Sequence, residues 1–224
     1  MGTLYLVRHG QASASAYGVE GVDGGPVPGS LTPTGQMQAQ VTGTALAGIV
    51  PGFTSAVSGS LIRQKQTLTG VLSAFDASPA PRVDDAWDEY DLSGLLGTTS
   101  ADDYADGRGF QTSLDAALGA WIRGDVDAPE SFDVYARRVA EAGQRAVEEA
   151  GSGKTVLVVS SAGSITLWLA QHLGIDAEHW PKLAASMMNA SITRTIVGRK
   201  GVTVLSVNEH LHLTDRDGGI ATFR

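Results

Sequence analysis

Hydrophobic and polar residues are arranged along the chain in blocks that predict strands followed by helices. Residues 3–7 (TLYLV) are a short β-rich run. Thr32 followed by Pro33 is typical of a helix start, because a hydroxyl can cap the helix and proline suits its first position. Residues 54–57 suit a second strand, and apolar residues at helical spacing follow over 61–75. The order therefore begins strand, helix, strand, helix.

A later segment, residues 155–160 (TVLVVS), is continuously apolar, which is typical of a strand buried on both faces. Residues 84–109 are acidic and broken by turn residues, so we expect a loop there. The pattern also predicts helices over 112–122, 131–150 and 164–174 and strands over 191–197 and 202–207. Alternating strands and helices predict an α/β fold, a three-layer α/β/α sandwich with a mostly parallel central sheet.

Composition narrows the function classes. The 224 residues fit one domain, 1–224, and the absence of cysteine excludes disulfides and thiolate chemistry. A net charge of −8 without a basic run argues against a nucleic-acid partner. No apolar stretch approaches the ~20 residues of a membrane span, so we expect no membrane partner and a cytoplasmic location.

Charged side chains follow the predicted parallel strands at the points where ligands bind in such sheets. Arg8 and His9 follow the first strand, Arg63 follows the second, and residues 160–164 follow the buried strand. Guanidinium forks and a helix N-terminus both suit phosphate. Either arginine alone would be read as a surface residue paired with a carboxylate, but their shared position at strand ends favours a phosphate pocket.

Several segments together resemble the histidine phosphatase superfamily, the phosphoglycerate mutase-like proteins. The first, Leu4-Tyr5-Leu6-Val7-Arg8-His9-Gly10, resembles the signature of that superfamily and is the most specific. The other similar segments are residues 31–35 (LTPTG), 58–67 (SGSLIRQKQT), 88–91 (DEYD), 189–193 (NASIT) and 208–213 (NEHLHL). The resemblance spans nearly the whole chain and implies the phosphoglycerate mutase-like fold, with residues 90–150 as an insertion covering the active site.

The resemblance also implies an activity and a set of roles. It implies a histidine acid phosphatase or phosphoglycerate mutase-like phosphatase in which His9 takes the phosphoryl group and Arg8 and Arg63 neutralise its charge. Glu89 would protonate the leaving oxygen and later deprotonate water; the alternative for Glu89 is a solvated carboxylate in an acidic loop. The partner would be a small phosphorylated substrate or inorganic phosphate. We expect no cofactor, and the five histidines show no metal-ligand spacing.

One motif departs from the family. Its second histidine, in V-x-S-H-G-G, is replaced by Ser161 in Val158-Val159-Ser160-Ser161-Ala162-Gly163. A serine donates one hydrogen bond but carries no charge, and the loss of one preorganised donor typically costs ~10²–10³ in rate. Ser161 and the backbone N–H groups at Ala162 and the positions after it would bind phosphate and replace part of that loss. We therefore expect a weakened phosphatase.

Two other functions fit parts of the sequence. A phospho-ligand binding protein of the same fold would use the arginines without turnover. A serine hydrolase would use Ser161 at a strand-to-helix turn, with Asp176 and His210 following in the order of an α/β-hydrolase triad, but it leaves Arg8 and His9 without a role. Residues 11–13 lack the tryptophan and asparagine that mutase members tend to show, which favours a phosphatase. A homodimer is compatible with the sequence.

Overall fold

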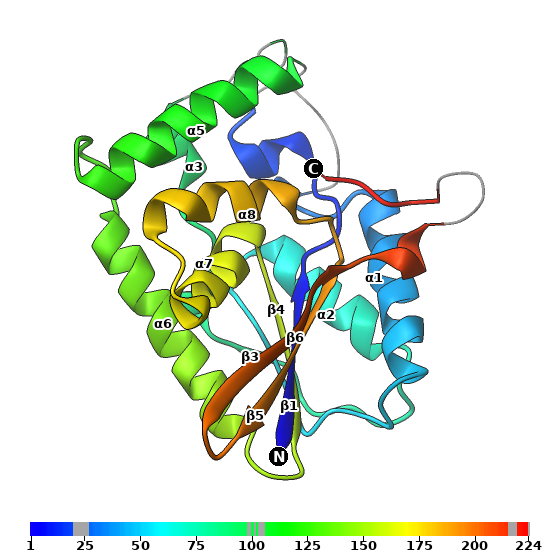
Figure 1. The fold of residues 1–224 in the computed structure, drawn as a ribbon. Coiled ribbons are helices and arrows are strands. Elements are labelled where there is room, and N and C mark those ends of the chain that lie inside the picture. The colour runs from blue at the N-terminus through cyan, green and yellow to red at the C-terminus, as the bar shows by residue number, and fades with distance from the viewer. Residues whose placement is uncertain (20–26, 98–99, 101, 103–105, 215–218, 224) are drawn as a thin grey trace.

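A computed structural model describes residues 1–19, 27–97, 100, 102, 106–214 and 219–223. Its centre is a six-stranded sheet in the order β3-β2-β4-β1-β5-β6, with helices on both faces (Figure 1). The strands are β1 (Gly2–Arg8), β2 (Ser55–Ser58), β3 (Arg82–Val83), β4 (Thr155–Ser160), β5 (Ile192–Gly198) and β6 (Gly201–Glu209). The first four pair in parallel, whereas β5 and β6 are antiparallel to their neighbours. The predicted three-layer fold with a mostly parallel sheet is confirmed.

The helices divide between the two faces of the sheet. They are α1 (Pro33–Ala47), α2 (Ile62–Leu72), α3 (Leu92–Leu96), α5 (Gly107–Arg123), α6 (Phe132–Glu149), α7 (Ala162–Leu173) and α8 (Trp180–Ser186). Short 3₁₀ turns are η1 (Ala14–Tyr17), η2 (Asp85–Trp87), η3 (Ala177–His179) and η4 (Leu211–Leu213). Side chains of a strand point alternately to opposite faces, so Leu4 and Leu6 join the core under α6 and α7, while Tyr5 and Val7 join the core under α1 and α2.

Local signals explain where the long helices begin. Thr32 caps α1 by accepting a hydrogen bond from the Gly35 N–H at 3.1 Å, and Pro33 occupies the first turn. Ser131 caps α6 in the same way, through the Val134 N–H at 3.4 Å. The predicted start of each helix lies within two residues of the observed start.

Four elements differ from the sequence expectations: α5 begins earlier than predicted, and α3, β3 and α8 were not predicted. Helix α5 begins at Gly107, five residues before the predicted start, because the Asp106 side chain caps it through the Gly109 N–H at 3.2 Å. The predicted loop over 84–109 therefore contains the start of α5 as well as α3. Strand β3 and helix α8 were not predicted, since two and seven residues are too short to show a period.

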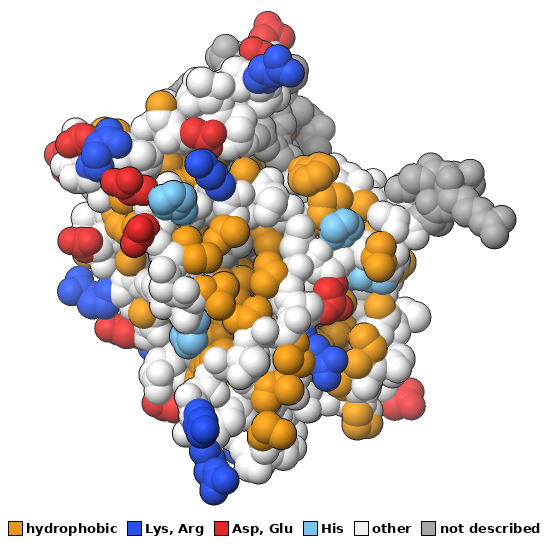
Figure 2. Space-filling view, in the orientation of Figure 1, with side chains coloured by type: hydrophobic (Ala, Val, Ile, Leu, Met, Phe, Trp, Pro, Cys, Tyr) orange, Lys and Arg blue, Asp and Glu red, His pale blue; other side chains and the backbone are white. Residues whose placement is uncertain are grey.

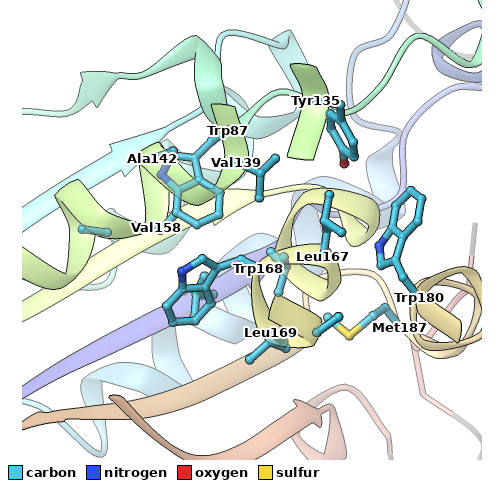
Figure 3. Packing of buried hydrophobic residues seen from close by; sticks show 14 of the residues in the cluster. Trp87, Tyr135, Val139, Ala142, Val158, Leu167, Trp168, Leu169, Trp180 and Met187 are labelled. Atoms are coloured by element: carbon cyan, nitrogen blue, oxygen red, sulfur yellow. The ribbon is translucent and has the colours of Figure 1, made fainter. Parts of the chain in front are cut away.

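The larger core lies between the sheet and the layer formed by α5, α6, α7 and α8 (Figure 3). Trp87, Trp168, Trp180 and Tyr135 are fully buried in it. The Trp180 indole N–H donates to the Gly163 carbonyl at 2.9 Å, which attaches α8 to the first turn of α7. This core therefore fixes the segment that follows β4, one of the three strand ends of interest.

Strand β6 forms one edge of the sheet, and its residues alternate between half-buried and exposed. Leu205 and Val207 are exposed there, and Figure 2 shows hydrophobic side chains gathered over this part of the surface with charged ones scattered around them. Among the helices that the structure describes, none combines the length and apolarity needed to cross a membrane.

Candidate active site

The three predicted strand ends meet at one cavity of about 1100 Å³. Its lining includes Arg8 at the end of β1 and His9 directly after it, Arg63 in the first turn of α2, and Ala162 and Gly163 at the start of α7. Helix α5 lies beyond these strand ends, at the top of Figure 1. The ligand position that parallel-sheet topology predicts is therefore hollow and carries the predicted cations.

His9 is buried at the floor of this cavity with one ring nitrogen already engaged. Its Nδ1 lies 2.7 Å from the Gly10 carbonyl oxygen, and only a protonated Nδ1 can donate there. The Nε2 atom is then the unprotonated acceptor, and it receives a hydrogen bond from Arg63 Nε at 3.2 Å. Burial and the neighbouring guanidinium groups of Arg63 and Arg8 lower the pKa of His9 well below its ordinary value. His9 is consequently a neutral imidazole with a lone pair on Nε2.

Arg8 and Arg63 are both largely buried and bring positive charge to the same place. Arg8 Nη1 donates to the Phe223 carbonyl at 2.7 Å and to the Met187 carbonyl, which orients its guanidinium. Arg8 Nε is buried and has no hydrogen-bond partner among the residues that the structure describes. A buried donor of this kind is costly unless a ligand satisfies it, so it suits an anion in the cavity.

Two glycines of the resembling segments pack against each other behind the histidine. A Cβ on Gly10 would lie 2.4 Å from the Gly35 carbonyl oxygen, and one on Gly35 would lie 2.0 Å from the Gln11 oxygen. The Gly10 N–H donates to Thr67 Oγ1 at 3.0 Å, and Thr67 donates to the Arg63 carbonyl at 2.7 Å. The end of β1 is therefore held against both α1 and α2, which positions His9 relative to Arg63.

Glu89 lies at the cavity wall with its carboxylate held by donors from two helices, α6 and α7. Oε1 accepts from the Tyr135 hydroxyl at 3.0 Å, and Oε2 accepts from the Gly163 N–H at 2.9 Å. Gly163 belongs to the first turn of α7, where the helix dipole favours a negative charge. One of the backbone donors that we expected to bind phosphate thus binds Glu89 instead. The two bonds fix the direction of the carboxylate without using all of its acceptor sites.

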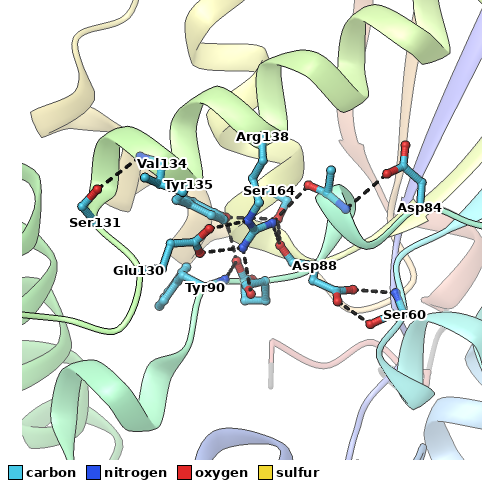
Figure 4. A network of polar contacts seen from close by, with 12 residues as sticks. Ser60, Asp84, Asp88, Tyr90, Glu130, Ser131, Val134, Tyr135, Arg138 and Ser164 are labelled. Atoms are coloured by element: carbon cyan, nitrogen blue, oxygen red, sulfur yellow. Dashed lines mark hydrogen bonds and ion pairs between the residues drawn. The ribbon is translucent and has the colours of Figure 1, made fainter.

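The segment that carries Glu89 is itself anchored by α6 (Figure 4). Arg138 donates to the Asp88 carbonyl at 2.7 Å and to the Ala86 carbonyl at 3.1 Å, and forms a two-point ion pair with Glu130. Asp88 accepts from the Ser60 N–H at 2.6 Å and from the Ser60 hydroxyl, so this carboxylate joins the segment to the start of α2. Arg138 lines the cavity, but its donors point to protein groups.

Ser161 is fully buried and lies behind the cavity wall. Its hydroxyl accepts a hydrogen bond from Gln64 Nε2 at 3.0 Å, and Gln64 also donates to the Trp87 carbonyl at 3.2 Å. Ala162, the next residue, lines the cavity. A phosphate contact from Ser161 stays a prediction.

Sequence reasoning missed Gln64 and Tyr135, which hold Ser161 and Glu89. The available signal was the spacing of Tyr135 and Arg138 on one face of a predicted helix, but nothing local indicates their partners.

His210, the proposed hydrolase base, has its Nδ1 2.6 Å from the Asn208 carbonyl oxygen. Three further arginines within residues 90–150 are exposed: Arg108, Arg123 and Arg137.

The charged groups at the cavity suit an anion better than a metal. Arg8, Arg63 and Arg138 line it, together with carboxylates from several elements. Within the described part of the chain, no three His, Cys, Asp or Glu side chains are grouped as metal ligands.

Fold and site define an α/β protein with an anion-accepting cavity at the ends of its parallel strands. The comparison with known protein families matches residues 4–210 to the histidine phosphatase superfamily (branch 1). The chain belongs to this superfamily, as the motif resemblance implied. A search of curated proteins found no match.

Solved structures of similar fold cover almost the whole chain. A phosphoserine phosphatase variant from Entamoeba histolytica, in complex with phosphoserine, is 20% identical, with a TM-score of 0.68 over 95% of this chain and 100% of that one. A putative α-ribazole-5′-phosphate phosphatase from Escherichia coli is 24% identical, with a TM-score of 0.70 over 93% and 98%. A mycobacterial glucosyl-3-phosphoglycerate phosphatase in complex with VO₃ is 24% identical, with a TM-score of 0.68 over 94% and 100%.

Proposed function

We propose that this protein is a phosphomonoester hydrolase that works through a phosphohistidine intermediate on His9. The observation that carries the proposal is the state of the imidazole. Its Nδ1–H donates a hydrogen bond to the Gly10 carbonyl oxygen at 2.7 Å, and burial beside two guanidinium groups lowers the pKa of the ring and keeps it neutral. A neutral imidazole with an unprotonated Nε2 is a nucleophile once a phosphoryl group takes the place of its hydrogen bond from Arg63 Nε, and the same guanidinium groups would neutralise phosphoryl oxygens.

The first step transfers the phosphoryl group to the protein. Nε2 of His9 attacks phosphorus, the N–P bond forms and the bond from phosphorus to the ester oxygen breaks. Arg8 and Arg63 stabilise the charge that spreads over the phosphoryl oxygens. Glu89 supplies the proton for the leaving oxygen, and the alcohol departs.

The second step returns the protein to its starting state. Glu89, now a carboxylate, takes a proton from a water molecule, which attacks phosphorus while the N–P bond breaks. Phosphate and the free imidazole result, so the balance is one phosphomonoester and one water converted to one alcohol and one phosphate. The hydrogen bonds from Tyr135 and Gly163 keep the Glu89 carboxylate directed in both steps.

We expect turnover to be slow because position 161 carries a serine. The hydroxyl is neutral and bonded to Gln64, so it does not supply the positive charge that an imidazolium would. The similar folds include proteins named as phosphatases of three different phosphate esters, which supports hydrolysis of a phosphate ester here. A homodimer, a cytoplasmic location and a covering role for residues 90–150 stay predictions.

The second candidate is a phospho-ligand binding protein without turnover, which the serine at position 161 favours. The test is phosphate release from a panel of phosphomonoesters by the unmodified protein, His9→Ala and, as a matched control, His179→Ala, which removes an exposed histidine. We expect release that only His9→Ala abolishes, together with an acid-labile phosphohistidine detected by ³¹P NMR during turnover. Absence of release by a folded protein that still binds phosphate would establish the second candidate.

A further inference from the structure

The cavity has two chemically different parts. Its floor carries the cations Arg8 and Arg63 around His9, whereas the wall formed by α5 and α8 is largely apolar. We propose that the substrate is a phosphate ester of an uncharged alcohol with an apolar or aromatic body, and that the body lies against this wall. The inference rests on the proposed hydrolase function and adds to it the class of leaving group.

The apolar wall is formed by elements that face each other across the cavity. Helix α5 contributes Phe110, Leu114 and Leu118, which recur every four residues and so share one face of the helix. On α8, Ala184 and Ala185 line the cavity with small side chains, which leave room opposite α5. The total volume of about 1100 Å³ exceeds what a phosphate needs and is typical of sites that hold a sizeable organic group.

The charges of the lining exclude a second anionic group on the substrate. Apart from the two floor arginines, the only cation in the described lining is Arg138, and its guanidinium is paired with Glu130 and with backbone carbonyls. The carboxylates of the lining are Asp85, Asp88, Glu89, Asp91 and Glu130. A substrate carboxylate would lose its hydration without gaining a cation and would face like charges, which opposes binding.

A cationic leaving group gains little hydrogen bonding here, because most of these carboxylates already accept hydrogen bonds from protein groups. Asp88 binds Ser60, and Glu130 pairs with Arg138. Asp91 caps α3 through the Gly94 N–H at 3.0 Å, and the hydrogen bonds it accepts lower its pKa. The wall formed by α5 and α8 therefore offers contact area, and the charged groups around it offer no unengaged cation for a second anionic group, which favours an uncharged body.

The first experiment compares substrates whose leaving oxygens are chemically equal. Primary alkyl phosphates from ethyl to hexyl have similar leaving-group basicity, so a change in kcat/KM along the series reports burial of the chain. We expect kcat/KM to rise by up to about fourfold for each buried methylene. A second pair, the phosphate ester of 3-(4-hydroxyphenyl)propanoate and that of its amide, differs by one remote carboxylate. We expect the amide to be hydrolysed at least tenfold faster.

The outcomes separate this inference from the proposed function. Activity that depends on His9 but is flat along the alkyl series, or that favours the carboxylate, overturns the apolar preference and leaves the hydrolase intact. If no substrate is turned over, titration calorimetry on the same series replaces kcat/KM with Kd. Tighter binding of longer chains would then support the apolar site while refuting hydrolysis, and chain-independent binding would refute both.

A charge placed on the wall should reverse the preference. Leu114→Lys adds a cation to the lining, whereas Ser113→Lys adds the same charge at the adjacent exposed position. The readout is the amide-to-carboxylate ratio of kcat/KM within each variant, which does not depend on the folded fraction. We expect at least a tenfold fall in this ratio for Leu114→Lys and no change for Ser113→Lys. Ala185→Lys, at an exposed position on the opposite wall, gives the same test if Leu114→Lys does not fold; an unchanged ratio would refute the inference.

Discussion

Gly163 offers a way to move Glu89 while leaving the fold in place. A Cβ at position 163 would lie 2.2 Å from Glu89 Oε1 and 2.9 Å from Tyr90 Cε1. Ordinary contact between these atoms needs about 1 Å more. The carboxylate is the far end of a flexible side chain, so in Gly163→Ala we expect it to shift by about that amount and to weaken its bond to the Gly163 N–H.

The magnitudes separate activity from stability. A displacement of about 1 Å at a reacting group can cost roughly 10² in rate, so we expect kcat to fall about a hundredfold. Alanine is favoured over glycine in a helix by up to about 1 kcal/mol, which offsets the loss of one hydrogen bond of about 1 kcal/mol. The free energy of unfolding should therefore change by less than about 1 kcal/mol.

Steady-state phosphate release measures kcat, and urea unfolding of the same proteins measures the free energy of unfolding. Gly119→Ala is the matched control, since its Cβ would meet only Arg123 Nη1, at 3.3 Å on an exposed side chain, and we expect unchanged kcat. In a Glu89→Ala background, Gly163→Ala should have little further effect, because the carboxylate it displaces is absent. Full activity of Gly163→Ala, or an equal hundredfold loss in that background, would refute the reasoning.

Three further changes test other parts of the site. Arg138→Met removes the donors that hold the Glu89 segment, so kcat should fall about tenfold and the free energy of unfolding should fall by about 1–3 kcal/mol. Arg137→Met, on the exposed face of the same helix, should leave both quantities unchanged. Equal effects of the two substitutions would count against a positioning role for Arg138. Tyr135→Phe removes the one side-chain donor to Glu89 in the described part of the chain, and we expect a three- to tenfold lower kcat in the phosphate-release assay; an unaltered kcat would show that the backbone donors suffice. Because folding lowers the pKa of His9, the unfolded chain binds more protons below about pH 6.5, so stability falls as pH decreases through that value, by up to about 1.4 kcal/mol per pH unit. Urea unfolding between pH 6.5 and 5 should show a shallower dependence for His9→Asn, and an identical slope would mean that His9 is protonated in the folded state.

Much of the fold could be predicted because its signals are local. The apolar run of β4 and the proline-led start of α1 are visible within a few residues, and both lie where expected. Topology then brings Arg8, His9 and Arg63 to one edge of the sheet. Helix α8 and the early start of α5 were missed, since a seven-residue helix and a glycine-containing first turn give weak periodic signals.

The sequence by itself determined the order of the longer strands and helices, and with it the cations at the strand ends, because periodicity and chain order are properties of neighbouring residues. Only the tertiary structure decided the partners of those groups. Tyr135 is 46 positions from Glu89, and Gln64 is 97 positions from Ser161. No local pattern indicates such pairs, because packing of α6 and α7 against the sheet brings them together. Packing likewise turned Arg138 toward backbone carbonyls, where it holds the segment that carries Glu89.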